Sequence, residues 1–478
     1  MKKEDVYYQA MLARDHRFDG KFFIGVKTTG IYCRPICPAK PKRHNIEFFA
    51  NYLEAEKAGY RPCKRCRPEA APSSPAWIGK SATVKRALKI LNSTDVIQFN
   101  EDDFAAKFGV SARHLRRLFN DEIGRTPKQI AFENRLHLAR KLMVETNLPI
   151  TEVAYASGFS SIRRYNAAFK EKFRQTPTTI RKHKVKGGSS IQISLSYRPP
   201  FDFDNLLHFY KSHKVGDLEW FDDDKICRVV EIEGKVGTVT MWNQADKSMV
   251  NVEIDFPDTS KIHMILSQVR NFLDIDMDPL VVTNALERDP KIKKLIHKYP
   301  GTRLPSGWDG FEIGVSTILG QLVSIAQGRS LVADLIDLLG KDSGLEREGK
   351  KIKLFPRPKD IINGDLSSLK TTNRRKDTIV AFAKAVDGGQ LSLESTQSTE
   401  DFYKKLINIH GIGPWTASYM SLKALRDTDA FPQTDLIIAR ALEKYSADKI
   451  EKMRPWRGYV AILLWQEYAS VLSRSKTK

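Results

Sequence analysis

The chain has 478 residues, and at about 150 residues per domain this length predicts roughly three domains. Its hydrophobic content of 41% is ordinary for a folded protein and excludes wholesale disorder. No apolar run approaches the roughly 20 residues of a membrane helix, and the N-terminus, MKKEDVYYQA, has no apolar secretory segment. We therefore expect a soluble, cytoplasmic protein that does not interact with a membrane.

The charge is concentrated in one part of the chain. Residues 1–186 hold 37 basic and 18 acidic side chains, a net charge of +19 out of +21 for the whole chain. Residues 187–478 are close to neutral, with a net charge of +2. A strongly basic segment of this kind is typical of nucleic-acid binding. A basic surface that only keeps the protein soluble is the alternative.

Three stretches of linker-like composition divide the chain: PEAAPSSPAW (68–77), KHKVKGGSS (182–190) and, more weakly, LDIDMDPL (273–280). They predict domains at residues 1–75, 80–183, 191–278 and 279–475. In the third of these, ICRVVEI and GKVGTVTMW alternate apolar and polar residues, which predicts a small antiparallel sheet. From residue 279 onward the pattern is that of amphipathic helices.

Four of the five cysteines fall within 34 residues, as CRPIC and CKRC. In a cytosolic chain such clustering favours a metal site over disulfides. Zinc prefers four tetrahedral ligands, and two close pairs can supply them. We predict one Zn²⁺ bound by Cys33, Cys37, Cys63 and Cys66. A zinc ribbon with a purely structural role is the alternative to a reactive site.

The motifs TTGIYCRPICPAK and RPCKRCRPE closely resemble the methyl-phosphotriester domain of Ada-type DNA-alkylation response proteins, over about residues 1–75. The resemblance implies that Cys33 accepts a methyl group from DNA in one irreversible transfer. Zinc would keep the thiol ionised and nucleophilic. Methylation would then make the site less negative, and we infer that this change strengthens DNA binding. Among the basic residues beside the cysteines, Lys64 and Arg65 are expected to contact the DNA backbone.

Residues 80–183 contain two similar helical halves. In FGVSARHLRRLF, Gly109 suits a turn and Ser111 suits the start of a second helix; SGFSSIRRYNAAF repeats this pattern. The residues predicted to face outward are Arg113, Arg116 and Arg117 in the first half, and Arg163 and Arg164 in the second. A helical adaptor is the alternative to a helix-turn-helix.

Two such halves, followed by RTP (125–127) and QTP (175–177), resemble the AraC-type DNA-binding domain. The resemblance implies that two recognition helices read adjacent segments of the major groove. It departs from the family at Arg174, where glycine is usual. We therefore expect the second half to end differently from the first.

The segment LINIHGIGPWTASYM (406–420) places G-I-G between two helical runs. Gly411 and Gly413 would let backbone amides approach a DNA phosphate at a helix N-terminus, which predicts a helix-hairpin-helix that binds DNA. Asp435 lies at the start of a later helical run. By itself it would be an acid favoured by the helix dipole.

The hairpin, Asp435 and RPWRGYVAILLW (454–465) together resemble AlkA-type 3-methyladenine DNA glycosylases, over about residues 195–470. The resemblance implies that Asp435 is the essential carboxylate and that Leu322 fills the space left by a flipped nucleotide. The aromatic residues at matching positions of the base pocket are Trp415, Tyr419, Trp465 and Phe209; electron-rich rings suit a cationic alkylated base. A lysine would stand at Trp415 in relatives that also cut the strand, so we expect no strand cleavage.

We therefore expect a multidomain α+β protein with a small zinc domain, an all-α double helix-turn-helix domain, a small antiparallel β/α subdomain and an all-α helix-hairpin-helix glycosylase domain. Its expected function is DNA alkylation repair in an adaptive response. Methyl-phosphotriester acceptance would be coupled to transcriptional activation, and alkylated purines of the 3-methyladenine type would be excised hydrolytically. The expected partners are double-stranded DNA, as alkylated DNA and promoter sites, and RNA polymerase, with the protein acting as a monomer. The alternative is a zinc-dependent, damage-responsive transcription factor whose glycosylase half only recognises damage.

Overall fold

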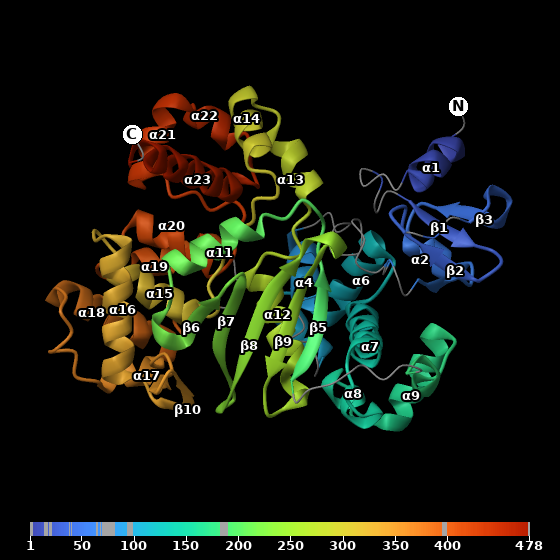
Figure 1. The fold of residues 1–478 in the computed structure, drawn as a ribbon, viewed down its shortest axis with the longest axis horizontal. Coiled ribbons are helices and arrows are strands. Elements are labelled where there is room, and N and C mark those ends of the chain that lie inside the picture. The colour runs from blue at the N-terminus through green and yellow to red at the C-terminus, as the bar shows by residue number, and fades with distance from the viewer. Residues whose placement is uncertain are drawn as a thin grey trace. The chain divides into compact units, whose positions relative to one another are not determined.

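The computed structural model describes residues 3–13, 18, 22–37, 39, 41–63, 66, 68, 82–92, 99–181, 190–393 and 399–476. Contacts within the chain separate two compact units, residues 1–191 with 259–267 and residues 192–258 with 268–478. Figure 1 labels most of the helices and strands of both units. Within the described ranges, no helix is both long enough and apolar enough to cross a membrane.

The first unit begins with a small sheet that carries the cysteines. Its strand order is β3-β1-β2-β4, in which β1 (Phe23–Val26) pairs antiparallel with β2 (Ile31–Cys33) and β3 (Ile46–Phe49), and β4 (Arg61–Pro62) pairs parallel with β2. Two helices accompany it, α1 (Lys3–Leu12) and α2 (Tyr52–Lys57). The ring of Tyr7 on α1 stacks on the buried Phe22, with ring centroids 4.1 Å apart. Aromatic packing therefore compensates for the small size of this sheet.

The rest of the first unit is helical, as predicted. Its helices are α4 (Ala82–Asn92), α5 (Glu101–Ala106), α6 (Ala112–Ile123), α7 (Pro127–Glu145), α8 (Ile150–Ala156), α9 (Ile162–Phe173) and α10 (Pro177–Ile180). Ser111 and Ser161 are the N-caps of α6 and α9, and each side chain accepts a hydrogen bond from the third residue beyond it. Both TP pairs begin helices: Thr126 and Thr176 are N-caps, and a proline follows each at the first helical position.

The end of the second half has the same shape as the end of the first, so the expected difference at Arg174 is wrong. Gly124 ends α6 in the left-handed conformation with φ 72°, and Arg174 ends α9 in that conformation with φ 54°. The amide of each residue donates to the carbonyl four residues earlier, at 3.0 Å and 2.8 Å respectively. Backbone hydrogen bonding therefore imposes the αL cap even where the residue has a side chain.

Four charged residues connect the cysteine-bearing sheet to both helical halves, and we call them the Glu56 cluster: Glu56, Arg125, Glu133 and Lys172. Their side chains are only 13–19% exposed. Glu56 on α2 pairs with Lys172 on α9 at 2.8 Å and with Arg125, which precedes α7, at 3.0 Å. Glu133 on α7 contacts both cations. The hydroxyl of Tyr32, beside Cys33, also donates to Glu56 at 3.0 Å. The cluster therefore joins the strand that ends at Cys33 to α7 and α9.

The second unit contains a sheet with strand order β5-β9-β8-β7-β6. The strands are β5 (Ile191–Ser196), β6 (Glu219–Asp222), β7 (Lys225–Ile232), β8 (Lys235–Gln244) and β9 (Met249–Asp255). Helix α11 (Phe203–Ser212) follows β5, and helix α12 (Ile262–Phe272) follows β9; the first residues of α12, up to residue 267, belong to the first unit. The pairs from β6 to β9 are antiparallel, as the alternating residues predict. Arg228 on β7 is 3% exposed and pairs with Glu219 on β6 and Glu312 on α15 (Gly310–Leu319). This buried ion-pair network fixes the sheet to the helices, because removing one charge would leave the others uncompensated.

The remaining helices of the second unit surround two hydrophobic cores (Figure 1). The first core takes residues from α15, α16 (Ile325–Leu339), α17 (Pro358–Asn363), α18 (Asn373–Asp387), α19 (Thr399–Ile407) and α20 (Pro414–Lys423). The second takes residues from α13 (Pro279–Leu286), α14 (Pro290–Lys298), α21 (Leu436–Lys444), α22 (Ala447–Glu451) and α23 (Arg457–Lys476). Helix α20 contributes Met420 to the first core and Leu422 to the second, so it connects the two.

A short hairpin interrupts this helical region, which the periodicity had predicted to be all-α. Strands β10 (Asp342–Arg347) and β11 (Lys350–Lys353) are joined by Glu348 and Gly349, with φ values of 53° and 74°. Two consecutive positive φ values define the type I′ turn that closes two-residue hairpins. The glycine in EREGKK therefore turns the chain, which ordinary helical periodicity did not reveal.

We expect Arg174→Gly to raise the free energy of unfolding of the second half by about 1 kcal/mol, because glycine occupies the left-handed region without the cost of a side chain. Hydrogen-exchange protection of the α9 amides in the full chain measures this. The matched control is Gly124→Ala, which should lower the protection of α6 by a similar amount. Equal protection in wild type and Arg174→Gly would contradict the assignment of strain.

We expect Glu56→Gln to destabilise the first unit by about 2–4 kcal/mol, because Arg125 and Lys172 lose their shared counter-charge. Burial alone would raise the pKa of Glu56, but Lys172, His137 and Arg125 lower it below its ordinary value. The stabilisation should therefore be present above the ordinary pKa and disappear as pH falls through the lowered one. Hydrogen exchange of α2 and α9 against pH measures both effects. The control, Glu54→Gln on the exposed face of α2, should change stability by less than about 0.5 kcal/mol.

Candidate functional site

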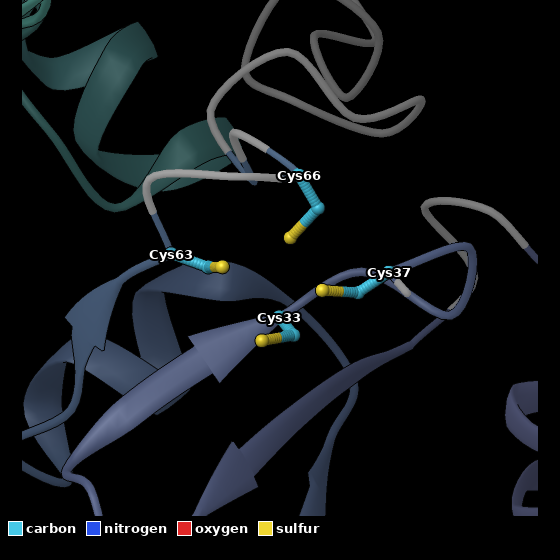
Figure 2. Close-up of side chains that lie close together, drawn as sticks. All are labelled: Cys33, Cys37, Cys63 and Cys66. Atoms are coloured by element: carbon cyan, nitrogen blue, oxygen red, sulfur yellow. The ribbon is translucent and has the colours of Figure 1, made fainter. Parts of the chain in front are cut away.

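The four clustered cysteines form a buried cage. Cys33 ends β2, Cys37 follows it in a tight turn, and Cys63 and Cys66 follow β4, so two loops bring the sulfurs together (Figure 2). All four Sγ atoms lie within 4.8 Å of one another, and the residues are 2–8% exposed. A tetrahedral zinc with bonds of about 2.3 Å needs sulfurs about 3.8 Å apart. The cage therefore fits zinc with little adjustment.

Backbone amides treat the four sulfurs unequally. The amide of Ala39 donates to Cys37, that of Cys66 to Cys63, and that of Arg34 to Cys66 at 3.3 Å. Among the residues that the structure describes, no backbone amide donates to Cys33. Hydrogen bonds to a thiolate spread its charge and weaken it as a nucleophile. The described amide donors therefore distinguish Cys33 from the other three cysteines.

Two buried arginines hold the loop of the second cysteine pair, and the sequence analysis missed both. Arg34 donates to the carbonyl of Cys66 at 3.1 Å, and Arg140 on α7 donates to the carbonyl of Cys63 at 3.2 Å. Arg34 directly follows Cys33 in CRPIC, so its position was a usable signal. Arg140 has no such signal. Lys64 and Arg65, predicted to contact DNA, lie outside the described residues.

The predicted recognition helices present their arginines to solvent. Arg113, Arg116 and Arg117 on α6 are exposed, as are Arg163 and Arg164 on α9. Arg116 also pairs with Glu101 on α5 at 3.3 Å, and Arg117 contacts His114 at 3.2 Å. Exposed side chains on both helices can reach base edges or phosphates.

The G-I-G motif forms the turn between α19 and α20. Gly411 has a φ of 88°, and a Cβ there would lie 2.0 Å from Oγ1 of Thr378, so only glycine fits. Gly413 is the N-cap of α20. Within the described part of the chain, the amides of Gly411 and Gly413 have no hydrogen-bond acceptor. Both are therefore available to an anion at the start of α20.

Leu322 stands out from the turn between α15 and α16. It has a φ of 54° and is fully exposed, an unusual state for a large apolar residue. Its neighbour Gln321 donates to the carbonyl of Gly411 at 3.1 Å and to Thr416 at 2.8 Å, and Arg375 donates to the Gln321 carbonyl. The exposed leucine is thus fixed to the hairpin turn.

Asp435 is the N-cap of α21, and four hydrogen bonds hold its side chain. Oδ1 accepts from the amides of Ile437 at 3.0 Å and Ile438 at 3.1 Å, and from Nε1 of Trp465 at 3.0 Å. Oδ2 accepts from Nε1 of Trp415 at 3.0 Å. All four donors are neutral, and among the described residues Asp435 makes no ion pair. These donors fix the orientation of the carboxylate and leave lone-pair capacity on Oδ2.

The four aromatic residues predicted to form the base pocket are linked in space. The Trp415 and Tyr419 rings stack with centroids 5.3 Å apart, and Tyr419 lies 6.0 Å from Trp465. Phe209 joins them through Lys423, a residue that the sequence analysis missed. Its Nζ lies 4.2, 5.7 and 5.9 Å from the ring centroids of Phe209, Tyr419 and Trp465. Lys423 follows Tyr419 by four residues and so lies on the same helix face, a signal that helical spacing contains.

A cavity of about 380 Å³ lies elsewhere in the second unit, along α16. Its lining includes Lys214, Arg329 and Lys351 but no aromatic residue. Because no aromatic ring lines it and Asp435 is not part of its lining, it does not match the predicted base pocket.

Three family models match the chain: the metal binding domain of Ada over residues 6–69, a helix-turn-helix domain over residues 104–183, and the AlkA N-terminal domain over residues 192–309. A Mycobacterium tuberculosis protein named "Probable bifunctional transcriptional activator/DNA repair enzyme AlkA" is 31% identical, and the match covers 96% of this chain and 95% of the relative. DNA-3-methyladenine glycosylase 2 of Escherichia coli is 27% identical over 57% of this chain and 96% of its own length.

Among solved structures, a 3-methyladenine DNA glycosylase from Archaeoglobus fulgidus aligns with a TM-score of 0.50 at 19% identity, covering 57% of this chain and 96% of that chain. This likeness concerns the fold. With the family models, it confirms the multidomain α+β fold class. The Ada metal-binding match and the four-sulfur cage confirm one zinc ion bound by the four cysteines.

Proposed function

The chain belongs to the family of bifunctional transcriptional activator/DNA repair proteins that combine an Ada-type metal-binding segment with an AlkA-type glycosylase, and from this we propose that it repairs alkylated DNA at two sites and activates transcription. The observation that carries the glycosylase part is the convergence of two indoles and two amides on Asp435. The predicted division into domains at residues 1–75, 80–183, 191–278 and 279–475 forms part of this proposal.

We assign Asp435 the role of the essential carboxylate. As the C1′–N bond of an alkylated purine breaks, positive charge develops on the sugar, and a fixed carboxylate stabilises it. Water adds its oxygen to C1′ and loses a proton to the carboxylate or to solvent, while the base leaves with the bond electrons. Alkylation at N3 or N7 already makes the purine cationic, so the base departs as a neutral molecule without further protonation. Oδ2 is the oxygen with lone-pair capacity for this task.

The enzyme should leave an intact strand with an abasic site. A glycosylase that also cuts the strand uses an amine nucleophile, and the matching position here is Trp415, whose Nε1 is engaged with Asp435. Leu322 would fill the space of the flipped nucleotide, and the amides of Gly411 and Gly413 would hold a backbone phosphate. The substrate is accordingly double-stranded DNA bent around this turn.

The first unit would remove methyl groups from phosphotriesters. Sγ of Cys33 attacks the methyl carbon and forms a sulfur–carbon bond. The bond between the methyl carbon and the phosphotriester oxygen breaks, and the phosphodiester leaves with the electron pair. Bound zinc would supply the ionised state of the thiols. The product is a thioether, so each protein molecule would react once. The match to the metal binding domain of Ada over residues 6–69, which includes CRPIC, supports the choice of Cys33 as acceptor.

We further propose that methylated protein binds promoter DNA as a monomer through the arginines of α6 and α9, and contacts RNA polymerase there. Methylation removes one negative charge beside the DNA backbone, which reduces repulsion from phosphate. Methylation of Cys33 would also affect α7 and α9 through the Glu56 cluster. The hydroxyl of Tyr32, the residue before Cys33, donates to Glu56, and Glu56 pairs with cations beside α7 and on α9. A damage-binding protein without catalysis is the competing function for the second unit.

We expect Asp435→Asn to slow release of 3-methyladenine from methylated duplex DNA by at least about 100-fold, because the amide carries no charge to stabilise the sugar cation. Single-turnover base release measures this, and a binding assay on the same duplex should show retained affinity. Asp309→Asn, at the N-cap of α15, is the matched control and should keep full activity. Unchanged release by Asp435→Asn would support the non-catalytic alternative.

We expect wild-type protein to gain the mass of one methyl group after incubation with DNA containing methyl phosphotriesters, and peptide mapping to place it on Cys33. Cys33→Ser should gain none, whereas Cys227→Ser, which removes a buried cysteine of the other unit, should react like wild type. A methyl group on no cysteine would favour a purely structural zinc site, whereas a methyl group on another cysteine would contradict the choice of Cys33 as acceptor.

A further inference from the structure

Lys423 places a buried cation among the rings proposed to hold the damaged base. It is the last residue of α20 and only 3% exposed. Its ammonium lies over Phe209 at 4.2 Å and within 6 Å of the ring centroids of Tyr419 and Trp465. These distances are typical of cation–π contacts. The protein's own cation thus occupies the electron-rich ring faces that suit a cationic base.

No negative charge balances this ammonium. Its hydrogen-bond partner is the carbonyl of Pro305 at 2.9 Å, and within the described ranges no carboxylate pairs with it. Burial lowers the pKa of Lys423 to about 7. By contrast, Arg457 of the same unit is held by Asp429 and Glu451. The loss of a proton from Lys423 near neutral pH therefore requires little free energy.

The other titratable groups around Lys423 come from three helices. His213 follows α11 and stacks on Phe209 at 4.1 Å; burial first, and then neighbouring cations including Lys423, lower its pKa to about 4. Tyr419 lies on α20, where burial and then Asp435 raise its pKa well beyond neutrality. Asp435 begins α21 and is held by the indoles of Trp415 and Trp465. From α23, Trp465 contributes a neutral ring. His213 and Tyr419 therefore do not titrate between pH 6 and pH 9, whereas Lys423 does.

We propose that Lys423 makes the base pocket selective by charge: its ammonium shares ring faces with the incoming base, so a cationic purine is accepted only with the neutral amine, whereas an uncharged purine is accepted in either state. This inference rests on the proposed glycosylase function and adds a residue that determines its specificity. Two like charges among the same rings repel each other in a medium of low dielectric constant.

The proton balance is simple. When a cationic base enters, one N–H bond of the ammonium breaks, the proton passes to bulk water, and the electron pair stays on nitrogen. The amine keeps two hydrogens and still donates to Pro305. Below its pKa, Lys423 is charged and opposes the cationic base; above its pKa, the opposition disappears. Excision of cationic bases should therefore increase with pH through the range near 7.

The test compares full-length wild type, Lys423→Met and Lys423→Arg on duplexes that contain 3-methyladenine, which is cationic, or hypoxanthine, which is neutral. Single-turnover release is measured from pH 6 to pH 9. On 3-methyladenine, Lys423→Met should be about tenfold faster than wild type at pH 6 and nearly equal at pH 9, since one proton accounts for about tenfold per pH unit below the pKa. Lys423→Arg, which cannot lose its charge, should be slow throughout.

On hypoxanthine the ratio of Met variant to wild type should not change with pH. A pH dependence caused by protonation of the neutral base would persist in the Met variant and so cancels from this ratio. The proposal is overturned if the ratio on 3-methyladenine is also constant, or if Lys423→Met is slower than wild type on this base at pH 6. If the Met variant does not fold, the pH profile of wild type is compared with that of Lys423→Arg. Base release by wild type should then increase with pH relative to release by Lys423→Arg, and a constant ratio would overturn the proposal. Absence of release of either base by wild type would instead overturn the glycosylase function itself.

Discussion

The hydrogen bonds that converge on Asp435 are the constraint on which the chemistry of the second unit depends. One indole comes from α20 and the other from α23, while the amides belong to α21. These helices draw on both hydrophobic cores, so the carboxylate is correctly placed only when both cores are folded. An N-cap aspartate ordinarily shares its oxygens between amides and water. Here two indoles take the place of water, which fixes the side chain without neutralising it.

Features that depend on nearby residues could be predicted from the sequence. The metal cage follows from two close cysteine pairs, and the caps of α6 and α9 follow from serines that act on amides three residues away. The meeting of Asp435 with Trp415 and Trp465 is different. These residues are distant along the chain, and only the resemblance to a glycosylase family placed them together. Helical periodicity alone would have made Asp435 an ordinary cap.

Features that depend on the meeting of distant elements were missed, for identifiable reasons. The Glu56 cluster assembles charges from α2, α7, α9 and the residue before α7, and no charge count shows which of many lysines and glutamates are buried together. Lys423 had a local signal in its spacing from Tyr419, but Phe209 reaches it from α11. The different helix end expected at Arg174 was based on the presence of a side chain where glycine is usual. The conformation of Arg174 is set instead by a backbone hydrogen bond that any residue except proline can make.

At both proposed centres, neutral hydrogen-bond donors contact the anionic side chains, and the buried side-chain cations nearby bind neutral groups. At the cage, amides donate to three sulfurs while the guanidinium groups of Arg34 and Arg140 bind the carbonyls of Cys66 and Cys63. In the second unit, indoles and amides hold Asp435 while the ammonium of Lys423 rests on rings and a carbonyl. A side-chain cation paired directly with Asp435 would reduce the charge proposed to stabilise a sugar cation, whereas neutral dipoles position that carboxylate without adding an opposite charge. At the cage, by contrast, the zinc ion bonds directly to the sulfurs, and the two arginines bind only the carbonyls of the same residues. The two proposed centres therefore have in common that Arg34, Arg140 and Lys423 bind neutral carbonyls or ring faces and not the anionic atoms.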